Sequence, residues 1–224
     1  MISLIIAESA LEMVPKEIRT HPSVRNHAER ARRNPGDLLL DRSYHHAAMK
    51  GLRNAEKRGR PDLVHFALLS ALATPLYLQD GLTVYLHTTD DLVITIGRSV
   101  RLPKTYARFE TLLVQLLKTK VIETNGQVLL SISEMSFQEL SRKIRSDITV
   151  GLSSSGSMNS VRLVAEELRA TENATFVIGG FPKSDFSQEV LESINSLYSI
   201  SPTALEAHLV IARIIYDLEV LRNL

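Results

Sequence analysis

The segment Phe176-Val177-Ile178-Gly179-Gly180-Phe181-Pro182 is an apolar run that leads directly into two glycines and a proline. Such a run is typical of a buried strand followed by a sharp turn. Upstream, Ile148-Thr149-Val150-Gly151-Leu152 predicts a second strand, and residues 161–168 between the two have the apolar spacing of a helix. This strand, helix, strand order favours a parallel sheet, and therefore an α/β fold.

The rest of the chain continues the alternation of strands and helices. Ser9 or a neighbour is expected to begin a helix that holds Leu11 and Val14. Residues 21–36 are polar and Arg-rich, with too few apolar residues for a packed face, so we expect an exposed or mobile excursion there. We predict one domain, 1–224, with a basic extension or mobile excursion around 19–60 and a hairpin-like insertion around 82–100. The remaining expected strands are 2–7, 82–88, 92–96 and 128–132, and the remaining expected helical segments are 41–58, 61–72, 106–118, 136–144 and 204–221.

Composition limits the chemistry. The 224 residues include no cysteine, which excludes disulfides, thiolate nucleophiles and cysteine metal sites. No basic leader or apolar run of membrane-spanning length is found, so we expect a cytoplasmic protein without a membrane partner. Residues 1–60 hold 12 Lys and Arg against 7 Asp and Glu, whereas the remainder holds 14 against 18. This asymmetry indicates a surface that faces a polyanion; a solvated, charged helix face is the alternative.

Three loops are candidate ligand sites. Leu152 to Gly156 and Gly179 to Pro182 follow adjacent parallel strands, whose carboxyl ends meet at one edge of the sheet. Tyr198 to Thr203 precedes the last helix. The alternatives are that the glycines only permit sharp turns and that the Ser and Thr hydroxyls cap the helix.

Two basic groups are candidate sites for an anionic partner. In Arg58-Gly59-Arg60-Pro61-Asp62 the carboxylate of Asp62 can reach Arg60 across the helix start and aim its guanidinium at a phosphate or an anionic base. The alternative is that Asp62 only caps the helix. The second group has Tyr106 among its cations, which suits RNA better than a chance exposed loop does. Its cations are Arg101, Lys104 and Arg108.

Apolar residues surround most of the last helix, which therefore needs burial on more than one face, either in the core or in a dimer interface. The histidines at 45, 46, 65 and 87 have no coherent ligand spacing with carboxylates, so no metal is expected. No Gly-x-Gly-x-x-Gly follows a strand, which argues against a dinucleotide oxidoreductase.

Together the motifs resemble the archaeal and eukaryotic EMG/NEP ribosome-biogenesis methyltransferases of the SPOUT superfamily. The resemblance covers nearly the whole chain, and it is specific in combination although each motif alone is weak. The motifs are Leu40-Asp41-Arg42-Ser43-Tyr44-His45, Arg58 to His65, Tyr85-Leu86-His87-Thr88, Arg101-Leu102-Pro103, Arg108-Phe109 and Ile178-Gly179-Gly180-Phe181-Pro182.

The resemblance implies a trefoil-knotted α/β fold and a homodimer that uses S-adenosyl-methionine to methylate N1 of a pseudouridine in small-subunit ribosomal RNA. It also implies that Asp62 orients Arg60, while a role for Asp62 as general base stays open. Ribosomal assembly proteins are further expected partners. The implied RNA contacts are Arg60, Arg101, Lys104 and Arg108, and the implied cofactor contacts are Ser153, Ser154, Gly179, Gly180, Tyr198, Ser199, Ile200, Ser201, Pro202 and Thr203.

Such chemistry needs no metal or covalent nucleophile, because the sulfonium is already an activated methyl donor. Two alternatives remain: a related knotted enzyme that acts on another base or a ribose hydroxyl, and an RNA-binding assembly factor with secondary catalysis.

Overall fold

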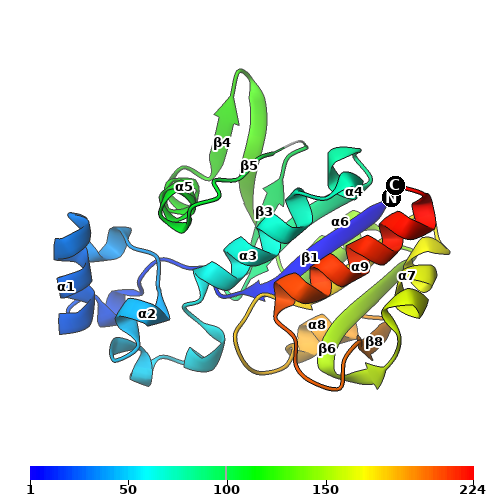
Figure 1. The fold of residues 1–224 in the computed structure, drawn as a ribbon. Helices are drawn as coiled ribbons and strands as arrows, with labels where there is room; N and C mark the ends of the chain where they lie inside the picture. The colour runs from blue at the N-terminus through cyan, green and yellow to red at the C-terminus, as the bar shows by residue number, and fades with distance from the viewer. Residues whose placement is uncertain (99) are drawn as a thin grey trace.

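The computed structural model describes residues 1–98 and 100–224. Within them the strands form one eight-stranded sheet in the order β4-β5-β3-β2-β1-β7-β6-β8 (Figure 1). The strands are β1 Ile2–Ser9, β2 Leu82–Thr88, β3 Leu92–Ile96, β4 Val121–Thr124, β5 Gln127–Glu134, β6 Ile148–Met158, β7 Ala174–Gly179 and β8 Ser196–Ser199. The α-helices are α1 Pro22–Ala31, α2 Arg42–His45, α3 Pro61–Leu72, α4 Pro75–Leu78, α5 Tyr106–Thr119, α6 Phe137–Ile144, α7 Val161–Arg169, α8 Gln188–Glu192 and α9 Ala207–Arg222.

The parallel part of the sheet comprises β2, β1, β7, β6 and β8, and the antiparallel part comprises β3, β5 and β4. β1 lies between β2 and β7 and is buried along its whole length, which explains why its sequence is almost continuously apolar. The predicted mostly parallel α/β architecture is therefore confirmed.

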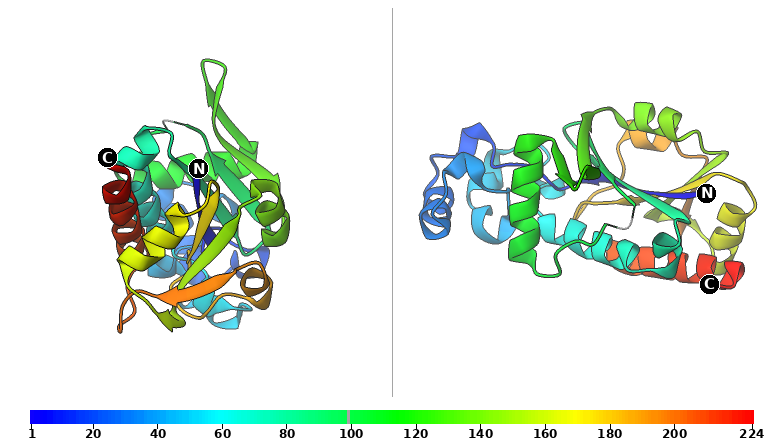
Figure 2. Two further views of the ribbon diagram at one scale, coloured as in Figure 1. Left: turned by 90° about the vertical axis from the view of Figure 1, so that its right-hand side faces the viewer. Right: turned by 90° about the horizontal axis from the view of Figure 1, so that it is seen from above.

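Helices cover both faces of the sheet (Figure 2). Residues of α3, α5, α7 and α9 pack with Ile2, Leu4 and Ile6 of β1 in the larger core. Residues of α6 and α8 pack with Ile5 and Ala7 on the other face. Because successive side chains of a strand point to opposite faces, β1 contributes to both cores.

The N-terminal lobe that contains α1 and α2 projects from one end of the sheet (Figure 1). It has its own apolar cluster, so residues 21–36 have a packed face that the sequence did not lead us to expect: α1 is a helix with Val24 and Ala28 buried. The other residues of this range are exposed or half-buried, in keeping with the exposed segment expected there. The helix expected near Ser9 is also wrong, because Met13 forms an isolated bridge to Leu39. Residues 41–58 are not one helix, and α2 is followed by short turns. The 3-10 turns of the lobe are Lys16–Ile18, Pro35–Asp37, Ala48–Gly51 and Ala55–Lys57.

Other differences concern strands. β2 and β3 form the expected hairpin, but β2 pairs in parallel with β1, so residues 82–88 belong to the central sheet and are not an insertion. The sequence patterns did not predict α4, β4, α8 or β8, and β6 is longer than expected, since it continues to Met158. In the described part of the chain, no helix is long and apolar enough to cross a membrane.

Candidate functional site

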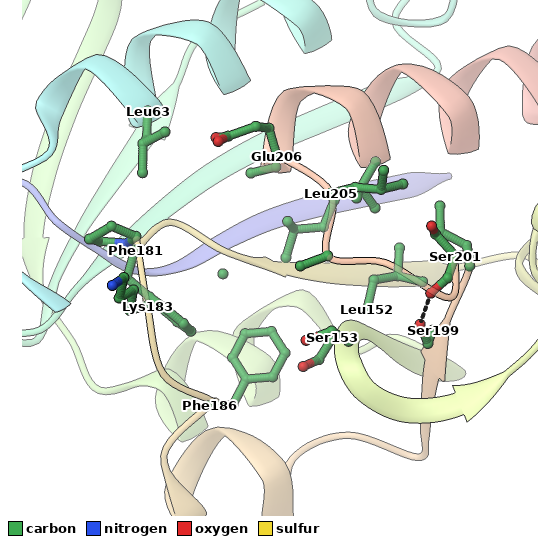
Figure 3. Close-up of a pocket in the computed structure, with 18 of the residues that line it drawn as sticks. Leu63, Leu152, Ser153, Phe181, Lys183, Phe186, Ser199, Ser201, Leu205 and Glu206 are labelled. Carbon is green, nitrogen blue, oxygen red and sulfur yellow. Dashed lines mark hydrogen bonds between the residues drawn. The ribbon is translucent and has the colours of Figure 1, made fainter. Parts of the chain in front are cut away.

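A cavity of about 280 Å³ lies where β7 and β8 end, beside the middle of β6, where the pairing of β6 with β7 ends at Leu152 (Figure 3). Its walls come from residues 152–154 within β6, from the last residues of β7 and β8 and the chain that follows them, from the residues around the start of α9, and from Arg60 and Leu63 at the start of α3. Residues 152–156, expected to be a loop, are therefore part of β6. This is the carboxyl edge of the parallel sheet, where open α/β folds commonly bind ligands. The three loops expected to bind a ligand therefore converge on one cavity.

Most of the residues predicted to contact a cofactor line this cavity. The structure places eight of them in its wall: Ser153, Ser154, Gly179, Tyr198, Ser199, Ile200, Ser201 and Thr203. Pro202 and Gly180 are not among the lining residues. The roles of all ten of these residues in binding a cofactor stay predictions.

Gly180 has a packing role. Its N–H donates to the carbonyl of Ala7, and its carbonyl accepts from the N–H of Ala10, both at 2.8 Å. A Cβ on Gly180 would lie 2.6 Å from the Ser9 Oγ and 2.8 Å from the Ser9 Cα. Only glycine therefore lets the chain after β7 cross so close to the end of β1.

The hydroxyls of the 198–203 loop bond within the loop. The Ser199 hydroxyl donates to the carbonyl of Ser201 at 2.9 Å, the bond drawn in Figure 3. The Ser201 hydroxyl lies 3.2 Å from that of Thr203 and accepts from the Thr203 N–H. The alternative that these hydroxyls cap α9 is wrong, because Glu206 is the N-cap and no side chain caps that helix.

Part of the cavity wall comes from residues that the sequence did not predict as ligand contacts. Lys183 and Phe186 belong to the segment that follows Gly179 to Pro182, and Leu205 and Glu206 precede α9 (Figure 3). The length of the two connections could have revealed these residues. The expected loops stopped at Pro182 and Thr203, although the chain continues for several more residues before α8 and α9 begin.

The Arg60 and Asp62 side chains form the ion pair that the sequence predicts. Arg60 Nε donates to Asp62 Oδ1 at 2.8 Å, and an Arg60 terminal nitrogen donates to Asp62 Oδ2 at 2.9 Å. This two-bond geometry fixes the plane of the guanidinium. Hydrogen bonding to Asp62 is the largest cause of a raised pKa of Arg60. Asp62 therefore holds a charged guanidinium at the wall of the cavity.

A second ion pair secures the segment just before Arg60. Both Arg58 and Glu12 are more than half-buried, and Arg58 Nε donates to Glu12 Oε1 at 2.7 Å. Burial raises the pKa of Glu12, although the hydrogen bond from Arg58 acts in the opposite direction. This pair fixes residues 58–60 against the chain that follows β1.

The second basic group lies on exposed surface beside α3. Arg101, Lys104 and Arg108 are all exposed. Arg101 and Lys104 lie in the loop before α5, and Arg108 lies in its first turn. His65 of α3 contacts both parts: its Nε2 lies 2.8 Å from the carbonyl oxygen of Pro103, and its ring stacks on Phe109 at 4.2 Å between centroids.

The Tyr106 hydroxyl donates to Asp41 Oδ2 at 2.8 Å, which joins α5 to the N-terminal lobe. Burial is the main cause of the raised pKa of Tyr106, so the phenol stays protonated as a donor. Through this bond the N-terminal lobe supports the start of α5, where Arg108 lies.

Two histidines extend this contact into the N-terminal lobe. The Asp41 N–H donates to His45 Nδ1 at 3.0 Å, and His45 Nε2 lies 2.9 Å from His27 Nδ1. Since His45 Nδ1 accepts, His45 Nε2 carries the proton and donates to His27. These histidines thus take part in a partly buried hydrogen-bond network. No group of three or more His, Asp or Glu side chains in residues 1–98 and 100–224 could hold a metal ion, and the absence of a metal stays a prediction.

Comparison with known proteins identifies the family. A family model described as EMG1/NEP1 methyltransferase matches residues 4–219. The chain belongs to this family. Relatives named ribosomal RNA small subunit methyltransferase Nep1 include that of Staphylothermus marinus, 38% identical over 100% of this chain and 97% of the relative. The Nep1 of Thermococcus kodakarensis is 40% identical over 88% of this chain and 90% of the relative.

A solved structure extends the family likeness to the fold. The crystal structure of Archaeoglobus fulgidus Nep1 bound to S-adenosylhomocysteine matches with a TM-score of 0.88 and 31% identity, over 99% of each chain. The SPOUT-class fold implied by the sequence motifs is thus confirmed at the level of architecture, while the trefoil knot stays a prediction.

Proposed function

We propose that this EMG1/NEP1 family member is an S-adenosyl-methionine-dependent methyltransferase that modifies N1 of a pseudouridine in small-subunit ribosomal RNA. The observation that carries the proposal is the cavity at the ends of β7 and β8, beside the middle of β6, because Arg60 and most of the residues predicted to contact the cofactor line this same cavity. The names of the relatives support ribosomal RNA of the small subunit as the substrate. S-adenosylhomocysteine, bound to the Archaeoglobus fulgidus Nep1, is what S-adenosyl-methionine becomes after it gives up its methyl group.

The cavity has the chemistry that this cofactor requires. Leu152, Ile178 and Leu205 offer apolar surface for an adenine ring, and the turns around them offer backbone donors and acceptors. Lys183 and Glu206 are exposed and provide charges of both signs for the amino-acid end of the cofactor. Its volume of about 280 Å³ is close to the lower end of the roughly 300–1,000 Å³ of small-molecule pockets. We therefore assign the loop residues and these five side chains to cofactor binding.

The bound cofactor would supply an activated methyl group, so the side chains of the chain need only bind, orient and stabilise the target base. Arg60, held in one plane by Asp62, would stabilise negative charge that develops on the base as N1 loses its proton. Both carboxylate oxygens of Asp62 already accept hydrogen bonds from Arg60, which makes Asp62 better suited to orient that residue than to act as a general base.

The RNA would lie across Arg60 and the exposed cations Arg101, Lys104 and Arg108. Contacts of this kind position the backbone without reading sequence. Selection of pseudouridine would therefore come from the geometry at the cavity.

We further propose that two chains associate through the outer face of α9. Leu209, Tyr216 and Val220 are 42%, 66% and 44% exposed there, and an exposed apolar face of this kind commonly marks a protein contact. We also propose that the chain forms a trefoil knot, that the protein is cytoplasmic and that it contacts ribosomal assembly proteins.

The decisive assay compares two otherwise identical ribosomal RNA fragments that carry pseudouridine or uridine at one site. With labelled S-adenosyl-methionine and mass spectrometry, we expect methylation only of the pseudouridine fragment, on N1. Equal modification of both fragments would show another base or a ribose hydroxyl as the target. RNA binding without methyl transfer would favour an assembly factor.

A further inference from the structure

The carboxyl end of β1 holds a buried acidic residue in an unusual conformation. Glu8 has a φ of 48°, in the left-handed region that a residue with a side chain seldom adopts. It is only 8% exposed. The pairing of β1 with β2 shifts register between Ile6 and Ser9, so the strand is irregular at this position. A strained, buried acid persists only where the surrounding structure holds it.

Glu8 is held from two segments that are far apart in the sequence. Lys57 Nζ lies 3.2 Å from Glu8 Oε1 and 3.1 Å from Glu8 Oε2, and Lys57 is itself 9% exposed. The backbone N–H of Ser187 donates to Glu8 Oε2 at 3.1 Å. One carboxylate thus binds both the segment that leads into Arg60 and the segment that follows β7.

Lys57 also contacts the wall of the cavity. Its Nζ lies 4.5 Å from the ring centroid of Phe181, a favourable distance for a cation over an aromatic face. Phe181 packs edge-on against Phe186 at 5.9 Å between centroids, and both rings line the cavity (Figure 3). Lys57 therefore joins the carboxylate of Glu8 to the aromatic wall of the cavity.

We propose that Glu8 and Lys57 are positioning residues that couple occupancy of the cavity to the RNA affinity of the segment ending at Arg60. The inference rests on the proposed function. Filling the cavity fixes Phe181 and the chain up to Ser187, these fix Glu8 and Lys57, and Lys57 is three residues before Arg60. Because coupling between two sites is reciprocal, RNA must tighten cofactor binding by the same factor.

The test measures RNA affinity with and without saturating S-adenosylhomocysteine, by fluorescence anisotropy on a ribosomal RNA fragment that the enzyme methylates. Coupling between sites in proteins is commonly about 5- to 150-fold, so we expect the wild-type dissociation constant to fall about fivefold or more. The reciprocal titration, S-adenosylhomocysteine with and without RNA, should give the same factor.

The informative variant replaces both members of the buried pair, E8Q with K57M, because removing one charge alone would leave the other buried and unpaired. Gln keeps an acceptor for the Ser187 N–H, and Met retains a contact with the Phe181 ring. We expect this variant to bind both ligands, with a coupling factor below about twofold, well short of the usual range for linked sites.

The matched control is E12Q with R58M, which removes the neighbouring ion pair. That pair holds the same segment, but its hydrogen bonds join Arg58 to Glu12 and to the carbonyl of Arg53, and the described part of the chain gives it none to Ser187. Its coupling factor should stay at the wild-type value even if both affinities change. Equal losses of coupling in the two double variants would mean that the Glu8–Lys57 pair has only a structural role.

The wild-type titrations separate two failures. If the chain binds no S-adenosylhomocysteine, the proposed function is wrong. If it binds both ligands with identical affinities alone and together, the proposed function stands and the coupling is overturned, whether or not the variants fold.

Discussion

Acidification should destabilise the N-terminal lobe through His45. This side chain is 0% exposed, and burial is the main cause that lowers its pKa to about 4. Protonation would also set a second N–H against the Asp41 N–H, which now donates to His45 Nδ1 at 3.0 Å.

The sign follows from the direction of the pKa shift. The unfolded chain binds a proton at His45 below its ordinary pKa of 6.5, whereas the folded chain does so only near pH 4. The stability due to neutral His45 is therefore present above pH 6.5 and is lost as the pH falls toward 4. With these two pKa values, the loss between pH 7.5 and pH 5.0 is about 2 kcal/mol.

Urea denaturation of the wild type and of His45→Gln at these two pH values measures the effect. The wild type should lose about 2 kcal/mol more than the variant on acidification, because Gln does not titrate. His46→Gln, a change at the exposed neighbour, is the control and should keep the wild-type pH dependence. Equal losses in the wild type and His45→Gln would refute the assignment of acid sensitivity to this histidine.

Four further changes test the site and the fold. Asp62→Asn should reduce turnover about tenfold in single-turnover methylation, because one charged hydrogen-bond partner of Arg60 is lost; unchanged RNA affinity with complete loss of turnover would favour base catalysis instead. Gly180→Ala should cost about 1–3 kcal/mol in urea denaturation, since its Cβ would overlap Ser9, and a neutral result would contradict that packing. Arg108→Gln should lower the slope of RNA affinity against salt by about 1, as expected for one phosphate contact, and an unchanged slope would remove it from the interface. Tyr216→Asp should convert a dimer to a monomer in light scattering, and a monomeric wild type would refute the dimer directly.

The sequence correctly predicted the elements whose own pattern of apolar residues shows which of their faces is buried. The strands at β1 and β7 and the helix α3 were found because their apolar residues are continuous or recur at helical spacing. α1 was missed because only Val24 and Ala28 of that helix are buried, and much of the cluster around them comes from turns and irregular segments. The spacing of apolar residues within α1 gives no information about packing partners that lie in turns elsewhere in the chain.

The candidate site also has some features that the sequence predicted and others that it could not predict. Sequence order placed residues 152–156 and the loop after β7 at one edge, although residues 152–156 are part of β6. The short spacing from Arg60 to Asp62 made their ion pair predictable. The contact of Glu8 with Lys57 joins residues 49 positions apart, and its contact with Ser187 spans 179. Neither spacing carries a local signal, so these contacts required the three-dimensional structure.

The position of β1 between β2 and β7 affects how the chain is made. Synthesis proceeds from the N-terminus, so β2 can pair with β1 long before residues 174–179 of β7 exist. During that interval one edge of an apolar strand lacks its neighbour and is open to pairing with other chains. The surface proposed to bind RNA is complete in sequence by Arg108, whereas the cavity needs residues up to Val210. A chain whose synthesis stops between Arg108 and Val210 would therefore bind RNA and tend to aggregate, but it could not form the cavity.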